Sequence, residues 1–173
     1  MNEVLNCLET RRSVRKYLQK QIADAELNAI LEAGIYAPTA MGRQSPKIVV
    51  LQKPEDVAEL ERMNAAVLGN PDSHPFYGAP TVLVVLADAK AGTAVEDGSL
   101  VLGNLMNAAH ALGVGSCWIH RAREEFASGE GKALLKRWGI EGDWVGVGHC
   151  ILGYAAEPAA PAKPRKADYI VRV

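Results

Sequence analysis

The sequence predicts one globular domain of layered helices and strands, in either the α/β or the α+β class. Helical patterns come first along the chain, and strand patterns then alternate with helical ones, which is typical of sheets covered by helices. The 173 residues match the length of one domain, alone or with a small appendage. Hydrophobic residues make up 49% of the chain, enough for an ordinary packed core, and this excludes disorder along its whole length.

The first part of the chain predicts two helices, a strand and a third helix. Residues 3–10 and 24–37 both carry apolar side chains at helical spacing, and Asp24 is a suitable N-cap for the second helix. Residues 47–51 (KIVVL) predict a compact buried strand. A third helix starts at Pro54, because proline is favoured in the first turn of a helix.

The second part of the chain predicts three more strands separated by helices. Residues 69–80 are dense in glycine and proline and exclude regular structure, whereas residues 81–87 (TVLVVLA) give the clearest strand. A helix over 96–112 is apolar nearly all round, and we expect it to be buried on several sides. It is followed by a glycine turn and strand over 113–119, a helix over 124–138 interrupted by glycines, and a strand over 145–154.

The last residues predict a tail outside the main domain. Residues 158–173 are rich in proline and alanine and cannot build a core, so they must lie along something already folded. Residues 1–157 then form the domain itself. The final Tyr169–Val173 has strand character and is able to extend a sheet edge, either its own or a partner's.

Composition excludes several function classes. The net charge is -1 and the pI about 6.4, which argues against general nucleic-acid or membrane-surface binding. No run of about 20 apolar residues is present, and the first residues do not resemble a secretory signal. Three cysteines without a CxxC spacing indicate neither a disulfide framework nor a zinc site. The expectation is a reduced, cytoplasmic protein.

Two basic clusters are candidate anion sites. Arg11, Arg12, Ser13 and Arg15 place three guanidinium groups and a hydroxyl within five residues, a set suited to phosphate. The alternative is a solvated basic turn. Lys163, Arg165 and Lys166 form the second cluster, for which a solubilising tail is the alternative interpretation.

The segment 37–46 (APTAMGRQSP) is a candidate ring-binding loop. Its small residues allow close backbone approach, and Gln44 offers a donor and an acceptor, which suits a flat heteroaromatic ring with polar edge atoms. An ordinary loop that ends a helix is the alternative. No GxGxxG or P-loop pattern accompanies the segment.

Histidine and cysteine positions do not predict a metal centre or a nucleophile. None of the histidines has metal-ligand spacing to another ligand type, and Cys117 on an apolar strand is expected in the core. His74, Phe76 and Tyr77 in the glycine- and proline-rich loop either cover a pocket or anchor a surface loop.

Taken together, the segments resemble the nitroreductase family of FMN-dependent oxidoreductases. The resemblance rests on residues 11–17 (RRSVRKY), 37–44 (APTAMGRQ), 108–119 (AAHALGVGSCWI) and the basic tail around 163–166 (KPRK), which occur in the expected order. The short chain is similar to the compact bacterial branch. Membership implies an α+β fold with a mixed central sheet flanked by helices, and an intertwined homodimer that holds two FMN molecules at its interface.

The resemblance also implies roles for single residues. Arg11, Ser13 and Arg15, with Arg12 nearby, would hold the FMN phosphate, and Lys163 and Arg165 would complete this site. The flavin ring would be lined, largely from the second subunit, by Pro38, Thr39, Ala40, Gly42 and Gln44. Passing beside its redox-active edge would be Ser116, Cys117, Trp118 and Ile119. His74, Phe76 and Tyr77 would form the lid of the substrate pocket.

Two departures from the family pattern concern the ring-binding loop. Gly42 stands where relatives often have asparagine, which removes a side-chain hydrogen bond worth about 1 kcal/mol. Ser45-Pro46 replaces a Pro-Trp pair that often follows the glutamine. Both bear more on redox potential and substrate choice than on the fold.

The implied activity is reduction of flat acceptors, such as nitroaromatics or quinones, with NADH or NADPH as electron donor. The flavin carries the chemistry in two stages, so no catalytic side chain is required. Alternatives are an FMN-binding protein that stores or senses flavin, and a flavin enzyme of the same fold that performs reductive dehalogenation or flavin fragmentation. A non-flavin structural domain with solvated basic clusters is the third interpretation.

Overall fold

The centre of the molecule is an antiparallel sheet of four strands, seen in a computed structural model that describes residues 2–173. The strands are β1 (Pro46–Leu51), β2 (Thr81–Asp88), β3 (Gly115–Ile119) and β4 (Trp144–Gly153), in the spatial order β1-β2-β4-β3. The α+β class is confirmed. Parallel pairing within residues 2–173 is confined to an isolated bridge between Ser13 and Ser116, so the sheet is mixed only at this edge.

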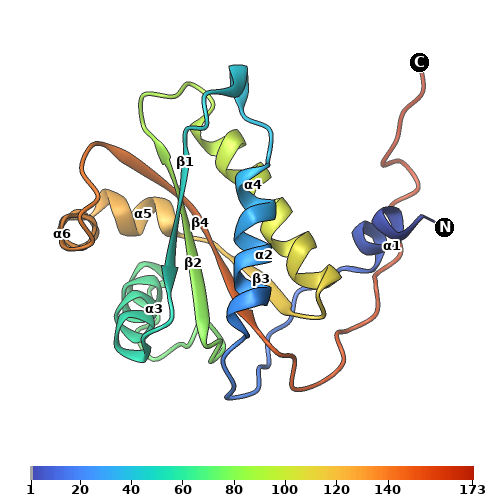
Figure 1. Ribbon diagram of the computed structural model, residues 1–173, viewed down its shortest axis with the longest axis horizontal. Helices are drawn as coiled ribbons and strands as arrows, with labels where there is room; N and C mark the ends of the chain where they lie inside the picture. Colours follow the sequence, from blue (N-terminus) through green and yellow to red (C-terminus); the bar gives the residue numbers. More distant parts are fainter. Residues whose placement is uncertain (1) are drawn as a thin grey trace.

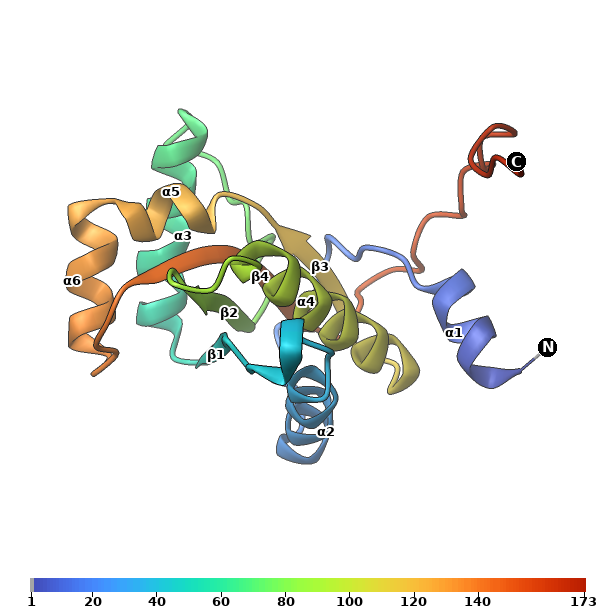
Figure 2. The same cartoon turned by 90° about the horizontal axis from the view of Figure 1, so that it is seen from above.

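Helices cover both faces of the sheet (Figures 1 and 2). On one face lie α2 (Asp24–Ile35) and α4 (Ala94–Ala111), and on the other lie α3 (Pro54–Leu68), α5 (Ala122–Ala127) and α6 (Gly129–Arg137). A short 3-10 helix, η1 (Ala40–Gly42), precedes β1, and α1 (Glu3–Thr10) begins the chain. The structure is therefore three layers deep, with the sheet in the middle.

Strand β2 explains the most apolar run in the sequence. Val82, Val84 and Leu86 pack into the core beneath α3, α5 and α6, whereas Leu83 and Val85 pack into the core beneath α2 and α4. Because successive side chains of a strand point to opposite faces, a strand covered on both sides is apolar at every position.

Three local predictions need correction. Strand β1 is an edge strand, since among residues 2–173 it pairs with β2 alone, and Val50 is exposed; it is not a compact buried strand. Helix α2 is capped by Ala23, whose N–H donates to Glu26 Oε2 at 2.9 Å, and Asp24 is its first residue. The single helix predicted over 124–138 is two helices, since Ser128 ends α5 and caps α6.

Helix α4 packs against α2 and against the sheet, so the expectation of burial on several sides is confirmed, although Leu100 is exposed. The predicted helix start at Pro54, the irregular loop over 69–80 and the limits of α1 are confirmed. Cys117 and Cys150 lie in the core on opposite faces of the sheet, and burial raises the pKa of Cys150.

The two ends of the chain project from the layered body on the same side (Figures 1 and 2). Helix α1 buries none of its residues and is fixed to the end of α4 by two contacts. Cys7 Sγ lies 3.3 Å from the carbonyl oxygen of Asn107, and Thr10 Oγ1 lies 2.9 Å from His110 Nε2. The tail over 158–173 is exposed, and Tyr169–Val173 forms no strand within its own chain.

Candidate functional site

The basic segment after α1 lies along the β3 edge of the sheet. The N–H of Val14 donates to the carbonyl oxygen of Ser116 at 2.9 Å, and the N–H of Leu18 donates to that of Tyr154 at the same distance. Tyr17 is buried in the core, and its hydroxyl donates to the carbonyl oxygen of Val14 at 2.7 Å. The segment is therefore held by backbone bonds, which bring the predicted site residues Ser13 and Ser116 together.

Two polar atoms of this edge are buried without a hydrogen-bond partner in residues 2–173. They are Nη1 of Arg11 and Oγ of Ser116. Arg12, in contrast, donates to the carbonyl oxygens of Glu9 and Arg11 at 2.8 and 2.7 Å. A buried guanidinium nitrogen without a partner is costly, and an anion with several oxygens would satisfy it. The segment thus fits a phosphate group.

A cavity of about 480 Å³ opens at the end of β3 and is called the β3 pocket. It gathers predicted site residues from three separate segments. The predicted residues that line it are Arg15, His74, Tyr77, Cys117, Trp118 and Ile119. Two further residues, His120 and Arg121, also line it, and no aspartate or glutamate does. The pocket therefore has a strongly cationic wall.

Phe76 does not belong to the pocket wall. Its ring is buried, with 1% of its surface exposed, and meets the ring of His149 edge to face at 5.4 Å between centroids. Its N–H donates to Glu61 Oε1 at 2.7 Å. Phe76 anchors the loop over 69–80 from below, so only His74 and Tyr77 of the predicted lid reach the pocket.

The predicted ring-binding loop lies elsewhere in the chain. Thr39 and Gln44 line a different cavity, of about 340 Å³, between α2 and β1. The N–H of Gln44 donates to Thr39 Oγ1 at 3.0 Å, which folds the loop back on itself. Within one chain, this loop and the β3 pocket are therefore separate.

Asp97, near the start of α4, holds the loop in place and was missed by sequence reasoning. It is buried, its Oδ1 accepts from the N–H of Ala40 at 3.0 Å, and its Oδ2 accepts from Ser45 Oγ at 2.8 Å. The bond from Ala40 lowers the pKa of Asp97 more than burial raises it, and Ser45 and Thr93 lower it further. A signal was present, because Asp97 interrupts the apolar stripe formed by Ala94 and Val101.

Backbone strain gathers in these two regions. The non-glycine residues with positive φ among residues 2–173 are Met41, Gln44, Tyr77 and Arg121. The first two belong to the loop and the last two line the β3 pocket. Gly42 also has a φ of 65°, and a Cβ there would meet nothing within 4 Å, so the position keeps the backbone shape that asparagine also tolerates. Strain of this kind is concentrated at functional sites.

The basic tail is not brought to the phosphate segment within one chain. It starts beside that segment, where Ser13, Arg15 and Lys16 line a cavity of about 200 Å³ with Glu157. Lys163 and Arg165 are exposed and line neither this cavity nor the β3 pocket.

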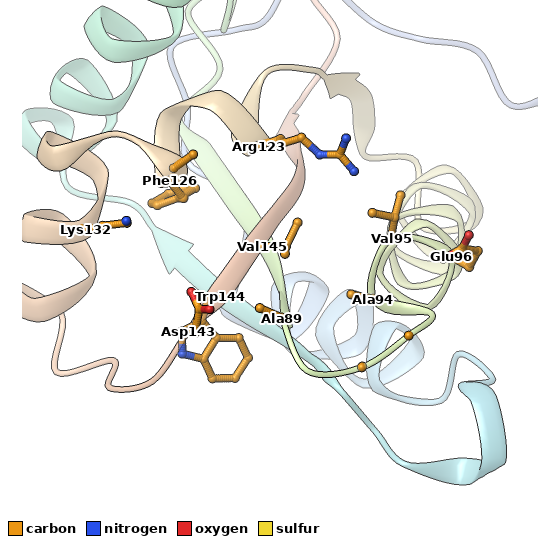
Figure 3. A pocket seen from close by; sticks show the side chains of 13 residues that line it. Ala89, Ala94, Val95, Glu96, Arg123, Phe126, Lys132, Asp143, Trp144 and Val145 are labelled. Atoms are coloured by element: carbon orange, nitrogen blue, oxygen red, sulfur yellow. The ribbon is translucent and has the colours of Figure 1, made fainter.

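A further cavity, of about 700 Å³, lies beside α5, where β2 ends and α4 begins, and is called the far pocket (Figure 3). It is enclosed by the start of α4, by α5 and α6, and by the start of β4. Figure 3 shows Arg123 reaching from α5 toward Val95 of α4. Its wall carries both charges: Arg123 and Lys132, and Glu96 and Asp143. None of the predicted site residues lines it.

The described residues contain neither a metal-binding cluster nor a membrane-spanning helix. Within residues 2–173, no group of three or more histidine, cysteine, aspartate or glutamate side chains is arranged to hold a metal ion. In the same part of the chain, every helix is too short or too polar to cross a membrane. The three cysteines are free.

The sequence matches the family model "Nitroreductase family" over residues 8–76 and 70–154. Two archaeal relatives are both described as "Putative NADH dehydrogenase/NAD(P)H nitroreductase". The protein of Archaeoglobus fulgidus is 33% identical over 160 residues, 89% of this chain and 86% of its own. That of Methanothermobacter thermautotrophicus is 30% identical over 124 residues, 67% of this chain; the match spans only 60% of that relative's length.

The fold agrees with a solved relative along its whole length. A crystal structure of a nitroreductase with bound FMN from Bacteroides fragilis superimposes with a TM-score of 0.91 at 34% identity, and the match covers 100% of both chains. The sequence match extends over most of the elements that build the β3 pocket and the ring-binding loop. The chain belongs to the Nitroreductase family.

Proposed function

We propose that this protein is an FMN-dependent oxidoreductase that uses NADH or NADPH to reduce flat acceptors such as nitroaromatics or quinones. The observation that carries the proposal is that one basic segment supplies Arg15 to the wall of the β3 pocket and holds the buried, unpartnered Arg11 Nη1. When bound, FMN would supply the redox chemistry that links oxidation of the nucleotide to reduction of the acceptor. The chain itself binds, orients and excludes water.

We assign binding of the cofactor's phosphate to the basic segment after α1. Arg11, Ser13 and Arg15, with Arg12 beside them, supply donors to several oxygens, and Ser116 Oγ is free to add another. Charge-assisted bonds of this kind are the strong ones, especially when guanidinium groups bind two oxygens at once. Lys163 and Arg165 of the tail join this site once the tail is folded against an assembled protein.

We assign binding of the flavin ring to β3 and to the loop over 37–44. Cys117, Trp118 and Ile119 form one wall of the β3 pocket. The opposite wall is contributed by a second copy, through its Pro38, Thr39, Ala40, Gly42 and Gln44, because the loop of the same chain lines a different cavity. His74 and Tyr77 sit at the mouth, where the acceptor and the nucleotide enter.

The homodimer that this requires is supported by apolar surface at the two ends of the chain. Val4, Leu5 and Leu8 of α1 are all exposed, and so are Tyr169, Ile170 and Val171 of the tail. A tail that buries none of its apolar side chains in its own chain favours a partner that covers them. Residues 1–157 then form the domain, and residues 158–173 act as its arm.

The proposal is tested by adding FMN to the protein stripped of bound flavin, followed by steady-state oxidation of NADH and NADPH with a quinone acceptor. The expected result is tight binding of FMN and turnover with parallel double-reciprocal plots, because the nucleotide leaves before the acceptor binds. Bound FMN without nucleotide oxidation would favour flavin storage or sensing. Failure to bind FMN would favour a non-flavin domain.

A further inference from the structure

Arg121 lies in the wall of the β3 pocket and is held there by contacts outside the proposed phosphate site. It lies two residues after the end of β3, caps α5, and has φ and ψ of 80° and 1°, a left-handed conformation that disfavours any residue with a Cβ. Glycine would adopt this conformation without strain. An arginine here therefore needs a compensating role.

Asn64 of α3 fixes the inner side of this arginine. It is fully buried, its Oδ1 accepts from Arg121 Nε at 2.9 Å, and its Nδ2 donates to the carbonyl oxygen of His120 at 2.9 Å. A buried asparagine is costly unless its polar atoms are bonded, and both of its ends bind this one turn. The terminal nitrogens of Arg121 make no hydrogen bond within residues 2–173, so a fork of donors is left for a ligand.

The charges of the residues that line the pocket favour an anion as the ligand of the terminal nitrogens of Arg121. Arg15 and Arg121 both line it, His74 and His120 add their rings, and no acidic side chain lines it. Glu61 is the carboxylate that contacts one of these groups, at 3.4 Å from His74 Nδ1. Arg15 belongs to the proposed phosphate site, which leaves Arg121 without an assigned anion.

We infer that Arg121, positioned by Asn64, is a specificity-determining residue that selects flat acceptors carrying a carboxylate or sulfonate. The inference rests on the proposed function and narrows its acceptor class. The guanidinium binds two oxygens of the anion side by side, while the aromatic part of the acceptor lies in the pocket. The phosphates of the nicotinamide nucleotide share this chemistry, so the test excludes the nucleotide.

The test measures binding without turnover on the FMN-loaded protein. Benzoate and benzamide have nearly the same shape and differ in charge, and neither is reduced. Their dissociation constants are obtained from changes in the visible flavin spectrum, for the wild type, Arg121→Gln, Arg121→Lys and the control Arg123→Gln. Arg123 is an exposed neighbour that lines the far pocket.

Wild type is expected to bind benzoate more tightly than benzamide. Arg121→Gln should weaken benzoate binding by about tenfold to a hundredfold and leave benzamide binding unchanged. Arg121→Lys keeps the charge without the fork and should recover part of the loss. The rate of reduction of 4-nitrobenzoate relative to 4-nitrobenzamide, with the flavin reduced beforehand by dithionite, should fall by a similar factor in Arg121→Gln.

Equal affinity for both probes in the wild type would overturn the inference, and so would equal weakening of both probes in Arg121→Gln. If Arg121→Gln does not fold, the same comparison is made with Arg121→Lys, where unchanged benzoate affinity would contradict it. These failures leave FMN binding and nucleotide oxidation intact. Loss of those two properties in the wild type would instead overturn the proposed function, and the inference with it.

Discussion

Two of the cavities flank the start of α5, and the smaller of the two has the features of a binding site. The far pocket holds about 700 Å³ and the β3 pocket about 480 Å³. Yet the far pocket mixes acidic and basic side chains, whereas the β3 pocket has cations and no acids among its lining residues. Left-handed arginine and tyrosine residues line only the β3 pocket of the two.

This difference shows that cavity size is a weak guide to a binding site. A surface hollow with balanced charge costs little to leave filled with water. Buried donors without partners, charge of one sign and strained backbone all cost free energy, so they persist where a ligand compensates for them.

The largest effect is expected at the contact that fixes α5 between the pockets. A Cβ on Gly146 of β4 would lie 2.1 Å from the carbonyl oxygen of Ala122, so Gly146→Ala forces α5 away from the sheet. The free energy of unfolding should fall by about 3 kcal/mol, the upper end for overpacking. Thermal unfolding measures this, and Gly129→Ala, where a Cβ meets nothing within 4 Å, is the control. Equal midpoints in both variants would contradict the packing argument.

Arg15→Ala should weaken FMN binding by about tenfold to a hundredfold, because a charge-assisted hydrogen bond is lost. Arg15 is exposed in the single chain, so stability should change little. Fluorescence titration with FMN measures the affinity. The matched variant in the far pocket is Lys132→Ala, for which unchanged FMN affinity is expected; a similar loss in both would erase the distinction between the two cavities.

Asp97→Asn should loosen the ring-binding loop, because the amide has one acceptor oxygen in place of two and the bonds from Ala40 and Ser45 lose the charge of the carboxylate. We expect a loss of about 1–2 kcal/mol in unfolding free energy and a fall in Tm of roughly 2–8 °C. Glu96→Gln, at an exposed neighbouring position in the far pocket, is the control.

The effect of Asp97→Asn depends on pH in a defined direction. The pKa of Asp97 is lowered in the folded protein, so its contribution is complete above the unfolded pKa of about 3.9. It disappears as the pH falls through the lower folded pKa. The stability difference between wild type and variant should therefore be constant near neutral pH and shrink in acid; a difference that grows in acid would contradict the assignment.

The smallest effect is expected from the tail. Lys163→Ala combined with Arg165→Ala should weaken FMN binding by about tenfold if these cations reach the phosphate in the assembled protein. Both residues are exposed, so folding of the chain should not change. Lys166→Ala is the neighbouring control, and unchanged FMN affinity in the double variant would remove the tail from the cofactor site.

Local patterns predicted most of the fold. The continuous apolar run of β2 predicted this strand, because a strand covered on both faces is apolar at every position. The helical spacing of α1 predicted the helix but not its surroundings, since its apolar side chains are exposed within one chain. The edge position of β1 was not predictable in this way. Its apolar residues resemble those of a central strand, and the order of strands in a sheet is decided by contacts distant in sequence.

The site was predictable in its segments but not in its assembly. Asp97 reaches Ala40 across 57 residues, and Arg121 reaches Asn64 across the same number, so no local motif contains either pair. Phe76 looked like a lid residue because its loop is irregular, and only the packing against His149 shows that it is an anchor. The separation of the loop over 37–44 from the β3 pocket is likewise a property of the three-dimensional fold.

FMN binding and its reduction by a nicotinamide nucleotide are tested by one anaerobic absorbance experiment on the purified protein. The visible spectrum is recorded after FMN is added and excess removed, and NADH and NADPH are then added separately. We expect the absorbance bands of bound oxidised flavin, and we expect at least one nucleotide to bleach them. A spectrum without flavin bands, or bands that neither nucleotide bleaches, would contradict it.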